Sequence, residues 1–252
     1  MPCFVRFTRA GQTSFGLLES GLVRELGGGL FDLPVPTGRS WALDDVRLLA
    51  PCEPGKVIAV GLNYRSHLQG RPAPAAPGLF IKLPTAICAH GDPIVVPPGA
   101  TDMHYEGEMV VVIGRRAKNV ARDQAASVVF GVTAGNDVSE RVWQKNDLQW
   151  FRAKGCDTFG PVGPGVVTGL DYHDLALETR VNGEVRQSQR TSDLIFDVET
   201  LISYITQFVT LLPGDLIFTG TPGTTRAMLP GDVIEVELEG VGVLRNTVTA
   251  PA

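Results

Sequence analysis

Short runs of Val and Ile, each closed by a turn that contains Gly, recur along this chain. Examples are KVIAVG at 56–61, MVVVIG at 109–114, and the pair LPGDLI and LPGDVI at 212–217 and 229–234. β-Branched residues favour strands, and Pro-Gly or Asn-Gly dipeptides favour the turns between strands. With 29 Gly and 18 Pro among 252 residues, few long helices are expected. The pattern therefore predicts a mainly β protein with some α-helix.

Composition excludes several classes of partner. The chain is 44% hydrophobic, enough to bury a large core with room for a pocket. Its net charge of −5 offers no basic surface for nucleic acid. No apolar run is long enough to span a membrane, and the first residues lack a secretory signal pattern. We therefore expect a cytoplasmic protein that binds neither nucleic acid nor membrane.

The four cysteines are widely scattered and show no CxxC spacing. Such a distribution argues against both a zinc cluster and a disulfide framework. We expect four free thiols.

The first 50 residues differ in pattern from the rest. Strand-like pieces at 3–7, 14–18 and 21–26 alternate with Gly-rich turns and carry no evident chemistry. The Pro- and Gly-containing stretch PCEPG at 51–55 ends this part. The prediction is a small N-terminal β lobe over 1–50, followed by a catalytic domain over 51–252.

Glu106 and Glu108 are two residues apart in a segment predicted to be a strand. Side chains at this spacing project from one face, with Cα atoms about 6.5 to 7 Å apart. Two carboxylates on a half-buried face repel each other unless a cation or a proton offsets the charge. No Lys or Arg lies in the strand itself, which favours a metal ion. The alternative is a solvated strand face.

Asp137 ends a second apolar run, 128–134, and precedes a helical pattern at 139–144. It is a third candidate ligand at the mouth of a strand-to-helix turn. The alternative is structural, because Asp137 with Glu140 three residues later fits a helix N-cap and its capping partner.

His104 shares the predicted strand face with Glu106 and Glu108, and this opens a second possibility for the metal. A His/Glu/Glu set favours zinc. The Glu/Glu/Asp set with water favours magnesium or manganese. The residues alone leave both sets open.

Seven segments, taken together, resemble the fumarylacetoacetate hydrolase family in order and spacing, over roughly residues 51 to 250. They are GLNYRSH (61–67), HYEGEMVVVIGRRAKNV (104–120), GNDVSERVWQ (135–144), AKGCDTFGPVGP (153–164), VNGEVRQ (181–187), LLPGDLIFTGTPG (211–223) and GVGVLRN (240–246). The resemblance implies a mixed β-roll, a distorted β-barrel with short helices, preceded here by the small N-terminal lobe. It also implies a homodimer.

By this resemblance Glu106, Glu108 and Asp137 bind a divalent cation, usually Mg²⁺ or Mn²⁺, and His104 is only a neighbour. The chemistry shared by the family is activation of a 2-oxo acid or 1,3-dicarbonyl compound. Its carboxylate and keto oxygens chelate the metal, which stabilises the enolate. A small dicarboxylate or 2-oxo acid is therefore the expected substrate.

The resemblance also implies roles for residues around the metal. His67, beside a lid over 69–78, matches the catalytic histidine and would act as a general base or proton shuttle. Lys154 matches a lysine that holds the substrate carboxylate or the enolate.

Three further residues are candidate substrate contacts. Gln144 and Thr221 match contacts of the family. Arg141 shares a helix face with Gln144, and its alternative role is to neutralise Asp137 or Glu140.

The chain departs from its family at Gly70. Members that hydrolyse or decarboxylate commonly have a Glu three residues after the lid histidine, where it orients the ring. No Glu occurs between Glu53 and Glu106, although a remote segment or second subunit could supply one. Without that carboxylate, His67 is a weaker base for driving water onto a carbonyl.

We therefore predict an isomerase, tautomerase or decarboxylase acting on a 2-hydroxy-diene or 2-oxo dioate. The alternatives are hydrolysis of a C–C bond in an acylpyruvate or fumarylacetoacetate, and an inactive binding protein on the same fold.

Overall fold

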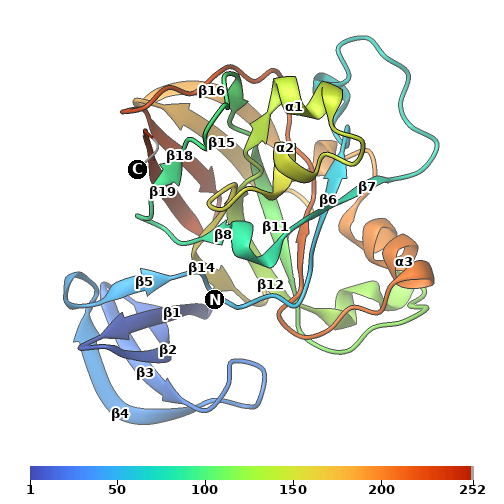
Figure 1. The fold of residues 1–252 in the computed structure, drawn as a ribbon. Helices are drawn as coiled ribbons and strands as arrows, with labels where there is room; N and C mark the ends of the chain where they lie inside the picture. The colour runs from blue at the N-terminus through green and yellow to red at the C-terminus, as the bar shows by residue number, and fades with distance from the viewer. Residues whose placement is uncertain (251–252) are drawn as a thin grey trace.

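The computed structural model describes residues 1–250 and is built on a twelve-stranded sheet that runs through the molecule (Figure 1). The strand order is β4 (Val35–Ala42), β3 (Leu22–Gly27), β2 (Gln12–Glu19), β1 (Cys3–Arg9), β14 (Gly160–Val167), β12 (Val129–Asn136), β11 (Gly107–Ile113), β17 (Leu216–Phe218), β6 (Val57–Gly61) and β7 (Gly78–Lys82). Off this path, β5 (Arg47–Leu49) pairs with β1 and β8 (Ile87–Cys88) pairs with β14.

A second sheet of five strands packs beside the first, and its strands β18 and β19 are drawn in dark orange to red in Figure 1. Its order is β16 (Glu184–Arg190), β15 (Ala176–Val181), β18 (Val233–Leu238), β19 (Gly242–Thr249) and β9 (Ile94–Val95). A short pair joins β10 (Met103–His104) to β13 (Ser139–Glu140). Residues 1–250 contain three α-helices, α1 (Arg141–Asn146), α2 (Phe151–Gly155) and α3 (Val198–Phe208). The prediction of a mainly β protein is confirmed.

Strand β11 is central because it is buried on both faces. Val110 and Val112 belong to one apolar cluster, whereas Met109, Val111 and Ile113 belong to another. A continuous apolar run is expected for a strand covered on both sides. Its partners β12 and β17 run antiparallel to it. The strand that starts between the two glutamates is thus held rigidly in the core.

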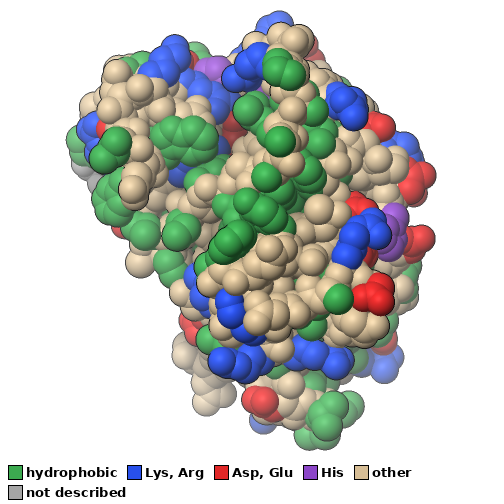
Figure 2. All heavy atoms as spheres, turned by 90° about the vertical axis from the view of Figure 1, so that its right-hand side faces the viewer, with side chains coloured by type: hydrophobic (Ala, Val, Ile, Leu, Met, Phe, Trp, Pro, Cys, Tyr) green, Lys and Arg blue, Asp and Glu red, His purple; other side chains and the backbone are tan. Residues whose placement is uncertain are grey.

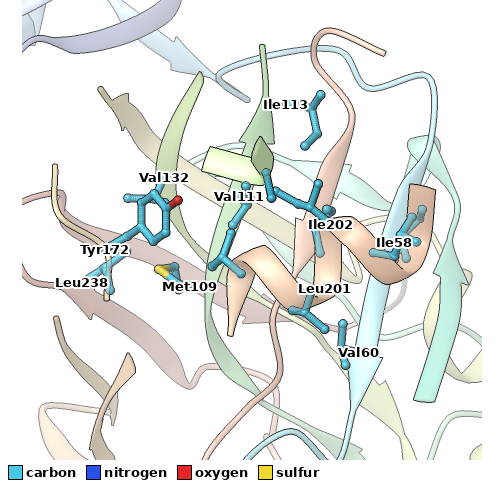
Figure 3. Packing of buried hydrophobic residues seen from close by; sticks show 14 of the residues in the cluster. Ile58, Val60, Met109, Val111, Ile113, Val132, Tyr172, Leu201, Ile202 and Leu238 are labelled. Atoms are coloured by element: carbon cyan, nitrogen blue, oxygen red, sulfur yellow. The ribbon is translucent and has the colours of Figure 1, made fainter. Parts of the chain in front are cut away.

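Helix α3 covers one face of this core. Figure 3 shows Leu201 and Ile202 directed toward Val111 and Val60, in the same cluster of buried residues. The Asp197 side chain accepts a hydrogen bond from the Thr200 N–H at 2.9 Å and caps the helix. The sequence pattern predicts an amphipathic packing helix over about 197–208, with Val198, Leu201, Ile202, Ile205 and Phe208 on one side. The structure confirms this helix.

One detail of that prediction is wrong. Phe208 was expected on the packing face of α3, but it is 64% exposed. It is the last residue of the helix, and its ring packs edge-on against Tyr204 rather than in the core.

The N-terminal lobe consists of β1 to β5 and lies at the lower left of Figure 1. It has a small core of its own, formed by Val5, Phe7, Val23 and Leu48. Because β1 pairs with β14, the lobe extends the large sheet instead of standing apart. The N-terminal β lobe is confirmed, and its boundary at residue 50 stays a prediction.

At the other end of the sheet, β7 is an edge strand. It exposes Leu79 and Ile81, and apolar side chains gather in the middle of the face seen in Figure 2. Phe80 and Lys82 alternate with them and point inward, Lys82 being completely buried.

No helix of residues 1–250 is long and apolar enough to cross a membrane.

Candidate functional site

A cavity of about 570 Å³ opens beside the start of β11. Its walls come from β6 and β7, the segment 62–71, the start of β11, helix α1, α2 and the turn after β17. All eight site residues predicted from the sequence line it: Glu106, Glu108, Asp137, His67, Lys154, Arg141, Gln144 and Thr221. The structure therefore brings together residues that are up to 154 positions apart in the chain.

The pairing of β11 with β12 places the three carboxylates side by side. Gly107 is opposite Asn136, and the Asp137 N–H donates to the Glu106 carbonyl at 2.8 Å. One ligand atom from each of Glu106, Glu108 and Asp137 lies within 4.8 Å of the others. All three side chains are buried, with residue exposures of 4%, 2% and 1%. The alternative of a solvated strand face is wrong.

Cations reach these carboxylates from outside the strand. The Lys154 ammonium donates to Glu106 Oε2 and to Asp137 Oδ2, both at 2.6 Å. Arg141 Nη2 donates to Glu106 Oε1 at 2.5 Å. Lys82, from β7, donates to Asp137 Oδ1 at 2.6 Å. Because these cations come from other segments, the lack of a Lys or Arg in the strand itself does not argue for a metal ion. The argument for a metal ion depends on the arrangement of the carboxylate oxygens.

The charges are unequally balanced among the carboxylates. Burial alone would raise the pKa of Glu106, but the nearby charges of Lys154 and Arg141 outweigh it and lower that pKa. Burial raises the pKa of Glu108, and the charges of Asp137 and Glu106 raise it further. Within residues 1–250, no Lys, Arg or His forms an ion pair with Glu108, which accepts only the Gly220 N–H, at 2.6 Å.

This donor set suits a hard divalent cation. Carboxylate oxygens are the ligands that Mg²⁺ and Mn²⁺ prefer. Lys154, Arg141 and Lys82 form ion pairs with Glu106 or Asp137, whereas no Lys, Arg or His of residues 1–250 forms one with Glu108. A cation beside Glu108 would relieve both its burial cost and the repulsion from its neighbours. The three residues form a candidate divalent metal site.

The structural interpretation of Asp137 as a helix cap is wrong. Helix α1 begins at Arg141, and its N-cap is Glu140, whose side chain accepts from the Trp143 N–H. Glu140 also accepts the N–H groups of Thr101 and Asp102, so this buried acid is fully used. Asp137 is thereby left to the carboxylate cluster.

His104 lines the same cavity, but both of its ring nitrogens are engaged. Nε2 lies 2.9 Å from Asp102 Oδ1, and Nδ1 lies 2.8 Å from Thr225 Oγ1. The His104 side chain is not part of the ligand cluster found in residues 1–250. The geometry favours the oxygen set over the zinc alternative.

His67 is oriented by a carbonyl group. Its Nδ1 lies 2.6 Å from the Gly223 carbonyl oxygen, so Nδ1 is the donor, and in the neutral ring Nε2 carries the lone pair. The Gly223 N–H in turn donates to Ser66 Oγ at 3.0 Å. Among residues 1–250, no carboxylate forms an ion pair with His67. The ring is thus oriented, but by a backbone carbonyl and not by a carboxylate of the described residues.

The turn after β17 ties the cavity together. The Thr221 hydroxyl donates to the Gly107 carbonyl at 2.9 Å and accepts from Gln187 Nε2 at 2.8 Å. Gln187 also accepts the Gly107 N–H at 3.1 Å and donates to the Pro222 carbonyl at 2.6 Å. Because the hydroxyl proton of Thr221 is committed to Gly107, its hydroxyl can only accept from a substrate.

Arg141 and Gln144 lie on the cavity side of α1, as predicted. Arg141 Nη1 donates to Gln144 Oε1 at 2.8 Å, and Nη2 donates to Thr225 Oγ1 at 2.8 Å as well as to Glu106. The expected alternative, neutralisation of Asp137 or Glu140, is wrong because the ion pair is with Glu106. The Gln144 amide nitrogen remains available to a substrate.

Two buried residues of the site were missed from the sequence: Lys82 and Gln187. Lys82 lies in an apolar run and shares a strand face with Phe80, which lines the cavity. A Lys inside such a run is a weak signal for a buried charge, since Lys is rarely buried unless it is paired. Gln187 lies in one of the recognised segments, but nothing local shows that it meets Gly107 and Thr221.

Two family models match this chain. The family model described as fumarylacetoacetate (FAA) hydrolase C-terminal matches residues 56–249. A second model, described as Rv2993c-like, N-terminal, matches residues 4–51.

Individual relatives match over most of this chain. Protein Rv2993c of Mycobacterium tuberculosis is 49% identical over 231 residues, covering 89% of this chain and 87% of the relative. The mitochondrial oxaloacetate tautomerase FAHD2A of Bos taurus is 42% identical, covering 81% of this chain and 70% of the relative.

A solved structure, titled as 2-hydroxyhepta-2,4-diene-1,7-dioate isomerase from Mycobacterium marinum, has 44% identity and a TM-score of 0.93. The match covers 99% of both chains. The fold expected from the resemblance, with its small N-terminal β domain, is therefore confirmed.

Proposed function

Because the chain belongs to the fumarylacetoacetate hydrolase family, we propose that it is a metal-dependent isomerase or tautomerase of a small 2-oxo or 2-hydroxy-diene dioate. The observation that carries this proposal is the arrangement in one cavity of a carboxylate cluster, a lysine with a spare donor, and a histidine oriented by a backbone carbonyl. These groups suit proton transfer within a substrate better than attack by water.

Glu106, Glu108 and Asp137 would hold the cation, Mg²⁺ or Mn²⁺, because the set contains only carboxylate oxygens. When bound, such an ion supplies Lewis acidity that favours the enolate form of a 2-oxo acid. Everything else in the reaction falls to side chains of this chain.

Lys154 would hold the anionic end of the substrate. Its ammonium has three N–H donors, and two are used by Glu106 and Asp137. The third has no protein acceptor in residues 1–250, and the residue lines the cavity. The negative charges of Asp137 and Glu106 outweigh the cost of burial and raise the pKa of Lys154, so it stays charged. A charged donor beside a developing enolate oxygen stabilises it.

His67 would move the proton. With Nδ1 donating to the Gly223 carbonyl, Nε2 can take a proton from carbon and return it to another atom of the substrate. A carbonyl orients the ring but carries no full negative charge to stabilise the imidazolium. The histidine is therefore better suited to reversible keto–enol or double-bond exchange than to activation of water.

The cavity also favours a second carboxylate on the substrate. Arg71 and Lys145 line it, and neither forms an ion pair within residues 1–250. Lys145 lies one helical turn beyond Arg141, about 6 Å along the axis of α1. A dioate with its 2-oxo acid end at the carboxylate cluster would place its distal carboxylate near these cations. The relatives named for a heptadiene-dioate and for oxaloacetate act on dioates by name.

The test is a side-by-side assay with added Mg²⁺ or Mn²⁺. Enol–keto exchange of oxaloacetate and of a 2-hydroxy-diene dioate is followed by absorbance, together with decarboxylation and acylpyruvate hydrolysis. We expect fast exchange and slow hydrolysis. Hydrolysis that is faster than exchange would overturn the proposal, and metal binding without any turnover would favour a binding protein.

Gly70→Glu sharpens this test by adding the carboxylate found in hydrolytic relatives. Gly70 has a φ of 84°, where any side chain strains the backbone, although open space surrounds it. Gly70→Ala is therefore the matched control, with the same strain and no charge. A gain in hydrolysis is expected for Gly70→Glu relative to Gly70→Ala.

The homodimer implied by the family is also part of this proposal. Light scattering of the purified protein should give a mass near twice the 27.0 kDa of one chain. A mass of 27.0 kDa would contradict the proposed homodimer.

A further inference from the structure

Lys82 contacts the carboxylate cluster but does not face the cavity. Its side chain is 0% exposed, and the residue is absent from the cavity wall. The ammonium lies 2.6 Å from Asp137 Oδ1, 2.7 Å from the Lys154 carbonyl oxygen and 3.4 Å from the Val138 carbonyl oxygen. Three acceptors use all three N–H donors of an ammonium. Lys82 thus has nothing left for a substrate.

Its contact with Asp137 fixes one oxygen of that carboxylate. Oδ1 is held by Lys82, while Oδ2 accepts from Lys154. A carboxylate held at one oxygen presents the other in a defined direction. Groups that hold ligand side chains in this way tune the site they support.

Its contact with the Lys154 carbonyl fixes the segment that carries the second lysine. Helix α2 has only five residues, and it starts after Trp150, which has a φ of 58°. So short a helix leaves its last carbonyls without partners inside the helix. Lys82 supplies one of those partners, and it thereby links the backbone of Lys154 to the carboxylate of Asp137.

We propose that Lys82 is a positioning residue that sets the orientation of Asp137 and Lys154 together. One buried ammonium holds both, so that Lys154 keeps a free N–H for the substrate while Asp137 keeps one oxygen directed at the cluster. The role rests on the proposed function for its catalytic consequence, but its effect on the carboxylates does not depend on which reaction follows.

The first test is Mn²⁺ binding to Lys82→Met without substrate. Removing a positive charge near the cluster would by itself tighten cation binding, whereas losing the group that orients Asp137 would weaken it. The two effects have opposite signs. We expect binding at least 10-fold weaker than in the wild type, the range seen when a partner of a ligand is lost. Unchanged or tighter binding would overturn the proposal.

Lys56→Met is the matched control. Lys56 forms an ion pair with the buried Asp215, at the opposite end of β6 and β17 from the cavity. Its loss should lower thermal stability and leave Mn²⁺ affinity unchanged. An equal loss of Mn²⁺ affinity in both variants would mean that Lys82 acts only through general stability, against the proposal.

The second test is a double-mutant cycle with Lys154→Met, read as kcat/KM in the exchange assay. Because part of the effect of Lys82 acts through Lys154, the double variant should lose less activity than the product of the two single losses. If the losses in kcat/KM of the two single variants multiply in the double variant, Lys82 and Lys154 act independently. That result would contradict the proposal. If the wild type binds Mn²⁺ but shows no exchange, the proposed function fails and the binding test still decides about Lys82.

Lys82→Gln serves if Lys82→Met does not fold. Its amide can still donate to Asp137 but carries no charge. For Lys82→Gln we expect a Mn²⁺ affinity that lies between that of the wild type and that of a ligand variant such as Asp137→Ala. Affinity equal to or above that of the wild type would overturn the positioning role.

Discussion

Glu25 in the N-terminal lobe and Glu108 in the cavity are both buried carboxylates, yet their surroundings are opposite. Glu25 accepts from Arg39 Nε at 2.9 Å, from Trp41 Nε1 at 3.0 Å and from Ser14 Oγ at 3.4 Å. The hydrogen bond from Arg39 lowers the pKa of Glu25, despite its burial. Glu108 has one backbone donor, no ion pair in residues 1–250 and two acidic neighbours.

The difference indicates that Glu25 stabilises the fold, whereas burial of Glu108 costs stability. A single acid surrounded by donors and a cation adds to stability. Three acids held within 4.8 Å of one another cost stability, and such arrangements persist where function needs them. Neutralising Glu25 and neutralising Glu108 should therefore have opposite effects on stability.

Glu106→Ala should have the largest effect. Turnover is expected to fall on the order of 10²- to 10³-fold or more, as for loss of a preorganised charge at a reacting centre. Lys154 and Arg141 also lose a buried partner, so stability should fall as well. Rates, Mn²⁺ titration and melting temperature are to be measured together. Retention of both metal affinity and turnover would remove Glu106 from the site.

Lys154→Met should follow, with a loss of about 10²-fold in rate. Methionine keeps the length of the side chain and removes the ammonium. Cation binding should be retained, because the three carboxylates remain. Kinetics unchanged from the wild type would contradict the role of Lys154 as the substrate's anchor.

Glu25→Gln should leave turnover unchanged and lower stability by about 1 to 2 kcal/mol, as for charge-assisted hydrogen bonds to a partly exposed arginine. Denaturant unfolding measures the difference. A fall in turnover at unchanged folding would show that the lobe and the cavity are coupled.

The smallest expected effect is the pH dependence of the stability difference between the wild type and Glu25→Gln. Since the folded state lowers the pKa of Glu25, its stabilisation is fully present above the ordinary Glu value of about 4.3. It is lost as the pH falls through the lowered pKa of the folded protein. The curves of wild type and Glu25→Gln should therefore converge in acid, and a gap that stays constant below pH 4 would contradict this explanation.

Local patterns were enough to predict one side of the cavity. Alternation along a strand placed Glu106 and Glu108 on one face, and helical spacing placed Arg141 and Gln144 together. The resemblance to a family added Asp137, His67 and Lys154.

Partners that only the tertiary fold brings together were not predictable. Lys82 reaches Asp137 across 55 positions, and the Gly223 carbonyl reaches His67 across 156. A carbonyl group has no sequence signature, so the orientation of His67 could not be read from residue types. The capping role went to Glu140 rather than Asp137 because β13 delays the start of α1 by several residues.

The most direct test of the contrast between the two regions is Glu108→Gln, measured by Mn²⁺ titration and by melting temperature in EDTA. Glutamine keeps the shape and can still accept the Gly220 N–H, while one charge leaves the crowded cluster. We predict at least a 10-fold loss of Mn²⁺ affinity together with a melting temperature equal to or above that of the wild type. Unchanged Mn²⁺ affinity would contradict the assignment of this cluster as a metal site, and a fall in stability like that of Glu25→Gln would contradict the contrast between the two regions.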